Sequence, residues 1–158
     1  MCNFLQQKLK NATHSLTRLG QLSLIERQIL WQALLWVVLI RLALSLFPFM
    51  KLRTLMKEVV QRVALSPPAL EATRDQILWA VQKVSRRIPG ATCLTQALAA
   101  RILLSQYHYP HQLCIGVDIG SGQPFSAHAW LEAGDQVLIG QLPDLSRYTK
   151  LPIDGELL

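Results

Sequence analysis

Apolar residues recur at helical spacing through the first two thirds of the chain and in short alternating runs through the last third. The earliest clear element is a helix that starts at Leu24. The segment Ser23–Glu26 has the capping-box pattern, in which a serine hydroxyl and a glutamate carboxylate satisfy free backbone N–H groups. This helix is expected to end near Leu46, because the residue before Pro48 is disfavoured in helical geometry.

Three further helices are expected from the same spacing, and prolines or glycines separate them: 50–64, 68–87 and 91–105. The segment Ser66–Pro68 interrupts the pattern, and Pro68 can then serve as an early helical residue. Pro89 and Gly90 end the third helix, and Thr92 is the candidate N-cap of the fourth.

Alternating apolar and polar residues then predict three strands, over 113–119, 125–132 and 136–141. Gly120–Gly122 forms a turn between the first two, and Ala133–Asp135 is a hairpin signal between the last two. Helices followed by an antiparallel meander indicate an α+β fold. We expect a helical N-terminal region over 1–88 and a catalytic core over 89–158, in one continuous domain.

Composition narrows the function classes. The 158 residues suit one domain, with 51% hydrophobic and 16% charged residues. The net charge of +6 could favour nucleic acid, anionic lipid or an acidic peptide. The cations are scattered and are not interleaved with aromatic residues, so no nucleic-acid surface is expected.

Three cysteines and no signal-peptide pattern indicate a reducing compartment, so the protein is expected in the cytoplasm. The apolar segment Ile29–Met50 is about long enough to cross a bilayer. Arg41 lies in its middle, at an insertion cost of roughly 2.5–3.5 kcal/mol. A buried helix or helix pair and a helix at the inner face of the membrane both remain open.

The candidate chemistry centres on Cys93. It falls in the first turn of the helix after Thr92, where free N–H groups and the helix dipole favour the nucleophilic thiolate. His128 lies in the expected strand Phe125–Glu132, which would pack on that helix. Each residue alone also suits a structural role. Together, a cysteine at a helix start and a later histidine on an antiparallel strand are typical of Cys-His hydrolases.

A metal site is the weaker alternative. His108, His111 and Cys114 have a spacing that could suit zinc, with Cys93 or His128 completing the set. Three-residue spacing in a loop that leads into a strand is a weak match to known zinc-ligand patterns. No metal and no cofactor are therefore expected.

The resemblance becomes specific in three segments: Thr92–Leu94, Gly116–Val117 and Phe125–Glu132, which reads FSAHAWLE. Together they resemble the lasso-peptide leader peptidase family, the transglutaminase-like "B" protein of lasso-peptide biosynthesis. The resemblance covers about Pro89 to Tyr148. It implies a transglutaminase-like fold and a cysteine protease that cuts the leader from a ribosomal precursor peptide.

That family commonly places an aspartate about twelve residues after the histidine, where this chain has Gly140. A two-residue turn would put His128 opposite Gln141, whose amide oxygen could accept from the imidazole N–H. Asp144 is close enough to take the same role. Gln141 as tentative orienter, Asp144 as alternative orienter, and a Cys-His dyad without either all remain open, because one sequence does not fix the register.

The resemblance also implies partners: the precursor leader peptide, a separate leader-binding protein and a macrolactam-forming cyclase. The chain has no room for its own leader-binding domain, so a separate one is expected. Two other functions remain open. One is transglutaminase-like acyl transfer to an amine. The other is a non-catalytic, membrane-associated interaction protein with a decayed Cys-His site.

Overall fold

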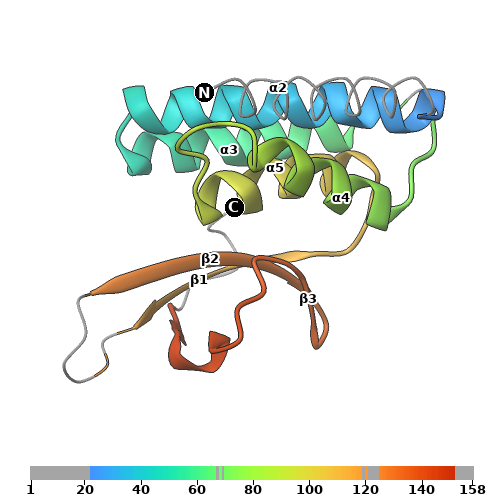
Figure 1. The fold of residues 1–158 in the computed structure, drawn as a ribbon. Coiled ribbons are helices and arrows are strands. Elements are labelled where there is room, and N and C mark those ends of the chain that lie inside the picture. Colours follow the sequence, from blue (N-terminus) through green and yellow to red (C-terminus); the bar gives the residue numbers. More distant parts are fainter. Residues whose placement is uncertain (1–21, 67, 69, 119, 121–124, 152–158) are drawn as a thin grey trace, which may run out of the picture.

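The structure, a computed structural model, describes residues 22–66, 68, 70–118, 120 and 125–151. Helices α2 (Leu24–Leu46) and α3 (Phe49–Ala64) form an outer layer, and α4 (Arg74–Ser85) and α5 (Cys93–Gln106) form an inner one. The sheet lies beneath the inner layer (Figure 1). This arrangement confirms the α+β class.

Side-chain caps set the helix starts. The Ser23 hydroxyl accepts from the Glu26 N–H at 3.2 Å, and the Ser23 N–H donates to the Glu26 carboxylate at 2.8 Å, so the expected capping box is present. Helix α4 begins at Arg74, six residues after the expected start at Pro68. Thr73 and Gln76 form a second capping box there, in which each side chain accepts from the other residue's backbone N–H.

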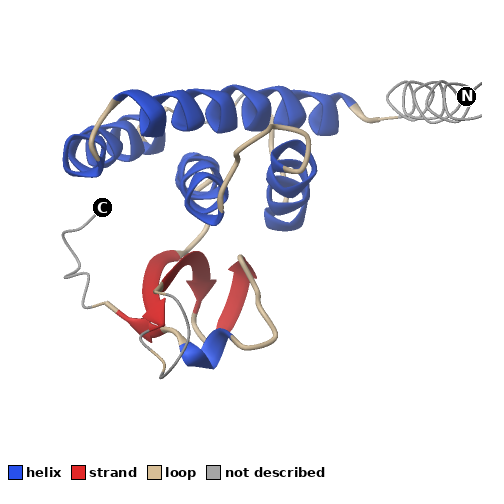
Figure 2. Cartoon of the chain, turned by 60° about the vertical axis from the view of Figure 1, so that its left-hand side comes forward, coloured by secondary structure: helices blue, strands red, loops and turns tan. Residues whose placement is uncertain are grey.

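The sheet has the strand order β3-β2-β1-β4 and is antiparallel throughout. Its strands are β1 (Gln112–Asp118), β2 (Ser126–Ala133), β3 (Gln136–Ile139) and β4 (Thr149–Lys150). The short 3₁₀ helix η1 (Leu145–Arg147) precedes β4. Figure 2 shows η1 on the side of the sheet away from the helices. Of the expected turn at Gly120–Gly122, residues 121 and 122 lie outside the described residues.

One hydrophobic core joins the helices to the sheet. Helix α5 is central, because it packs against α2, α3, α4 and β2. Ile102, Leu103 and Leu104 of α5 are fully buried, together with Ala129 and Leu131 of β2. This single core holds the start of α5 and the sheet in one unit.

Candidate active site

Cys93 is the first residue of α5 and is partly exposed. The Thr92 hydroxyl accepts from the Thr95 N–H at 3.4 Å, so Thr92 is the N-cap that the sequence predicts. The thiol therefore lies where free N–H groups of the helix end favour an anion. This position suits a nucleophilic thiolate and a backbone oxyanion donor.

Arg41 supports the segment that leads to Cys93. Gly90 has φ +73°, and a Cβ there would come within 2.7 Å of the Arg41 Nε and Nη2 atoms. The Arg41 guanidinium also donates to the Ser45 hydroxyl. Arg41, the charged residue within the apolar helix α2, thus packs against the α4–α5 connection, in a space that a side chain at residue 90 would fill.

His128 lies on β2 with its ring held on several sides. Its Nε2 lies 2.7 Å from the Gly140 carbonyl oxygen. A carbonyl can only accept, so Nε2 carries the hydrogen and Nδ1 is the acceptor nitrogen of the neutral ring. The ring stacks on Trp130 and meets Tyr148, with centroid separations of 6.0 Å and 5.5 Å. The imidazole is therefore oriented, with Nδ1 as its basic atom.

Cys93 and His128 belong to different sides of the sheet. Successive strand residues point to opposite faces. Ala129 and Leu131 enter the core shared with α5, and Cys93 packs against that core, so His128 and Trp130 point the other way. No hydrogen bond joins the Cys93 thiol to the His128 ring in the described chain. The structure brings α5 and β2 together but does not bring these two side chains into contact.

The two orienters expected from the sequence have other partners. The Gln141 amide donates to the Leu142 carbonyl at 3.3 Å, and Asp144 forms an ion pair with Arg147 at 2.6 Å. The partner of His128 is instead the carbonyl of Gly140, twelve residues after the histidine. Both side-chain assignments remain predictions. The Gly140 carbonyl is the candidate that side-chain reasoning missed.

A β-bulge explains the register. Ala133 pairs with Gln136 and Glu132 with Val137, as a two-residue turn requires, but Leu131 then pairs with Ile139. Leu138 is the extra residue. The bulge shifts the pairing of every later residue by one position. Unbroken pairing would have put Gln141 opposite His128, and the bulge removes it from that place.

Gly140 itself is required by close packing. Its φ is +86°, and a Cβ there would come within 2.8 Å of the Trp130 Cβ and 2.9 Å of the Ala129 carbonyl oxygen. Gly134, in the hairpin turn, also has positive φ, +58°, but a Cβ there meets nothing within 4 Å. The two glycines share the backbone conformation and differ in the space around them.

We therefore expect Gly140→Ala to lower the free energy of unfolding by at least about 2 kcal/mol, whereas Gly134→Ala loses about 1 kcal/mol from backbone strain alone. Urea denaturation of the two variants measures the difference. Equal losses would show that the contact with Trp130 contributes nothing.

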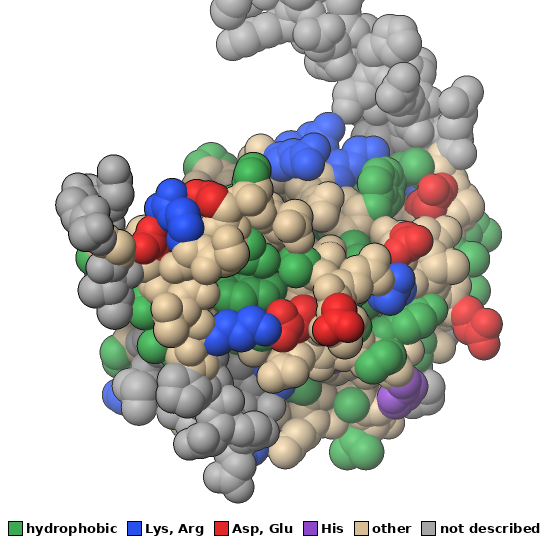
Figure 3. Space-filling model, turned by 90° about the horizontal axis from the view of Figure 1, so that it is seen from below, with side chains coloured by type: hydrophobic (Ala, Val, Ile, Leu, Met, Phe, Trp, Pro, Cys, Tyr) green, Lys and Arg blue, Asp and Glu red, His purple; other side chains and the backbone are tan. Residues whose placement is uncertain are grey.

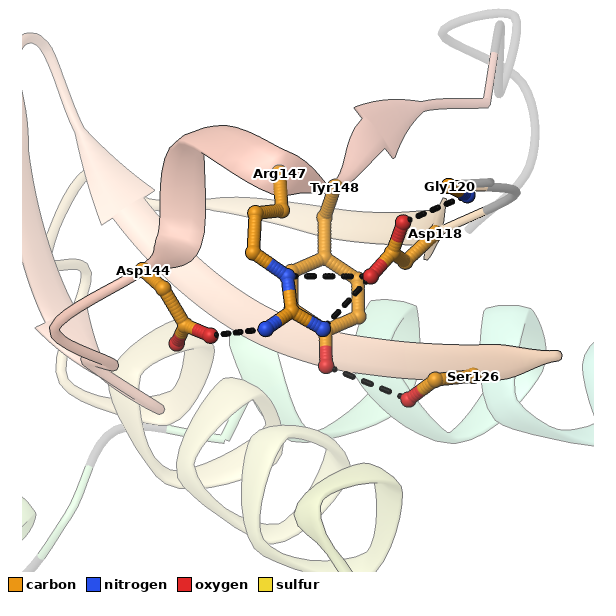
Figure 4. A network of polar contacts seen from close by, with 6 residues as sticks. All are labelled: Asp118, Gly120, Ser126, Asp144, Arg147 and Tyr148. Atoms are coloured by element: carbon orange, nitrogen blue, oxygen red, sulfur yellow. Dashed lines mark hydrogen bonds and ion pairs between the residues drawn. The ribbon is translucent and has the colours of Figure 1, made fainter. Parts of the chain in front are cut away.

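The face that carries His128 also holds a charged network (Figure 4). Arg147 donates to the buried Asp118 carboxylate through Nε at 3.0 Å and Nη2 at 2.6 Å, and the Gly120 N–H donates to it at 2.8 Å. The hydrogen bonds from Arg147, and to a smaller extent the one from Gly120, lower the pKa of Asp118 below its usual range. The Tyr148 hydroxyl lies 3.2 Å from the Ser126 hydroxyl. The network fixes η1 and Tyr148 over the sheet.

The pKa of Asp118 is lower in the folded protein than in the unfolded chain, where it is about 3.9. The ionised carboxylate therefore stabilises the fold at neutral pH. This stabilisation is lost as the pH falls below the unfolded pKa and through the folded pKa. Urea midpoints of wild type and Asp118→Asn should therefore differ most near neutral pH and converge in acid. A difference that stays constant with pH would contradict this ionised role.

Cys114 shares this sheet face but has a different environment. It is buried, and burial followed by its hydrogen bond to Glu132 raises the pKa of its thiol to about 12. Glu132 also accepts from Lys150 at 2.6 Å and from the Trp130 indole at 3.2 Å. Cys114 stays protonated at neutral pH and suits a structural role. Cys2 lies outside the described residues.

The alternative metal ligands do not gather in the described chain. The His111 ring contacts the Tyr109 carbonyl at 2.7 Å and the Ser105 hydroxyl at 3.3 Å, and His108 is exposed. No group of three histidine, cysteine or acidic side chains among the described residues could hold a metal ion.

The chain belongs to the Transglutaminase-like superfamily, whose family model matches residues 34–152. The match begins within α2 and includes the four strands of the described residues, so it covers parts of both expected regions, 1–88 and 89–158. Comparison with curated proteins and with solved structures finds no match. Enzymes of this superfamily typically use cysteine, histidine and aspartate. Membership therefore supports cysteine protease or acyltransferase chemistry.

Proposed function

We propose that this protein is a cysteine peptidase that removes the leader from a ribosomally made lasso-peptide precursor. The observation that carries the proposal is the place of Cys93 as first residue of α5, in a chain of the Transglutaminase-like superfamily. The segment Ser126–Trp130 adds the histidine and aromatic pattern by which the chain resembles leader peptidases.

In the proposed reaction the Cys93 thiolate attacks the carbonyl carbon of the scissile peptide bond. The backbone N–H of Cys93 donates to the oxyanion that forms. His128 takes the thiol proton and returns it to the leaving amine, which departs as the new N-terminus of the core peptide. Water then hydrolyses the thioester and releases the leader with a free carboxylate.

This reaction requires the His128 ring to reach Cys93. Catalytic hydrogen bonds are often long or misaligned without substrate and close in the complex with it. In the structure the two side chains lie on different sides of β2, so the proposed reaction requires α5 and β2 to rearrange until the imidazole turns toward the thiol. The hydrogen bond from Nε2 to Gly140 leaves Nδ1 as the nitrogen that would face the thiol.

Substrate delivery gives a further prediction. A separate leader-binding protein would hold the precursor near Cys93 and raise its effective concentration. We expect it to accelerate cleavage by about tenfold or more at low precursor concentration. Cleavage is measured by mass spectrometry with and without that protein. Full activity of the chain alone at micromolar precursor would contradict separate delivery.

The acyl group of the same thioester could be transferred to an amine instead of to water, as in a transglutaminase. The products distinguish the two reactions. Hydrolysis releases a leader with a free carboxylate, whereas transfer yields an amide whose mass includes the amine.

In the proposed pathway the cleaved core peptide then passes to a cytoplasmic cyclase that closes the macrolactam ring.

A second candidate is a non-catalytic, membrane-associated interaction protein that keeps the superfamily fold. It is favoured by one observation, the separation of Cys93 from His128 by the sheet. Incubation with precursor, leader-binding protein and cyclase tests the choice. Leader release that requires Cys93 supports the peptidase, and no release with all partners present supports the second candidate.

A further inference from the structure

The outward face of α2 is a continuous apolar surface that the rest of the described chain leaves uncovered. At 100° per residue its exposed side chains fall within about 120° of the helix circumference and extend about 33 Å along it. Trp31 is 71% exposed, Leu35 55% and Leu42 53%. We call this surface the α2 stripe; its members are Leu24, Trp31, Leu35, Val38, Leu39, Leu42 and Leu46.

The inner face of α2 is fixed to the protein. Ile29, Ala33, Val37 and Ile40 are buried in the core, and α2 packs on α4 and α5. Arg41 packs its guanidinium against Gly90. Among the described helices α2 alone is long and apolar enough to cross a bilayer, with a mean hydropathy of 2.1 over its most apolar window, yet only 22% of that window is buried. A helix bound along one side can enter a bilayer only in the plane of its surface.

The charges around the stripe favour an anionic surface. Arg27 is exposed at the edge of the stripe, one turn before Trp31, and Lys51 is exposed just beyond its other end. Glu26 is the only acidic residue in the α2 sequence, and its carboxylate is engaged by the Ser23 N–H in the capping box. The whole chain has a net charge of +6.

The opposite side of the molecule differs. Seen from the sheet side, basic and acidic side chains are interspersed around apolar ones (Figure 3). Helix α2, which carries the stripe, lies in the outer layer, with α4 and α5 between it and the sheet (Figure 1). Large exposed apolar surfaces of this kind mark interaction sites. A tryptophan and leucines on one helix face with flanking cations are the features of interfacial membrane helices.

We propose that the α2 stripe docks the protein in the plane of an anionic lipid bilayer. The stripe enters the boundary between headgroups and acyl chains, and Arg27 and Lys51 meet lipid phosphates. The sheet, with His128, Asp118 and Arg147, faces away from the lipid. This docking does not depend on the proposed peptidase activity, and its test contains no cleavage step.

Vesicle sedimentation of the full chain tests the proposal. Wild type should sediment with vesicles of mixed phosphatidylglycerol and phosphatidylcholine and more weakly with pure phosphatidylcholine. The double variant Leu35→Glu/Leu42→Glu should bind the mixed vesicles about tenfold or more weakly, because two leucines no longer enter the lipid. The control Phe125→Glu/Leu151→Glu adds the same charge at exposed sites on the sheet side and should bind like wild type.

Circular dichroism and urea midpoints establish that both double variants are folded, and light scattering gives their oligomeric state. Wild type that fails to sediment with the mixed vesicles would overturn the proposal. So would a stripe variant and a sheet-side variant that lose binding equally, since the loss would then follow net charge alone. A wild-type dimer that the stripe variant dissociates, with no vesicle binding, would assign the stripe to a second copy of the chain.

Discussion

Replacing Cys93 with alanine is expected to abolish leader cleavage, with a loss of at least about a thousandfold in turnover. The reason is chemical, because Cys93 supplies the only thiol among the described residues at the α5 start. Cys93→Ser should lose nearly as much, since a hydroxyl of almost the same size is far less ionised than a thiol. The initial rate of leader release, followed by mass spectrometry, measures both.

The other cysteines provide the controls. Cys114→Ala should retain cleavage, because a thiol whose pKa is raised to about 12 is protonated at neutral pH and lies in the sheet. Cys2→Ala should also retain it, since Cys2 lies outside residues 34–152 that match the superfamily. Cleavage by Cys93→Ala at the wild-type rate would remove the peptidase proposal.

His128→Ala is expected to lose about a hundredfold in turnover, the usual contribution of a general base. His108→Asn is the matched control, because His108 is exposed with φ 57°, a conformation that asparagine tolerates. A few-fold loss in a folded His128→Ala protein would assign the imidazole a structural role beside Trp130 and Tyr148.

Much of the fold follows from local chemistry. The capping box at Ser23 and the N-cap at Thr92 mark two helix starts, and the two-residue turn at Gly134 and Asp135 sets the first pairs of the β2–β3 hairpin. These features depend on neighbours within a few residues. The expected start of the third helix at Pro68 is six residues too early, because Thr73 and Gln76 form a second capping box that begins α4 at Arg74.

The geometry around His128 depends on long-range features that the sequence pattern does not express. The bulge between Leu131 and Glu132 leaves the alternation of β2 intact while it moves the partners of β3 by one residue. The glycine twelve residues after His128 could have suggested that a carbonyl replaces the missing carboxylate, because a backbone oxygen needs no side chain. Which sheet face meets α5 depends on the whole core, including Ala129 and Leu131.

The rate at which iodoacetamide alkylates Cys93 at neutral pH is a direct test of the proposed nucleophile, because the measurement does not need the natural substrate. Peptide mapping by mass spectrometry follows Cys93 in wild type and in His128→Ala, with glutathione as the unactivated reference thiol. We expect Cys93 to react faster than glutathione and His128→Ala to remove much of this excess rate. A Cys93 that reacts no faster than glutathione, in a folded protein and regardless of His128, would contradict it.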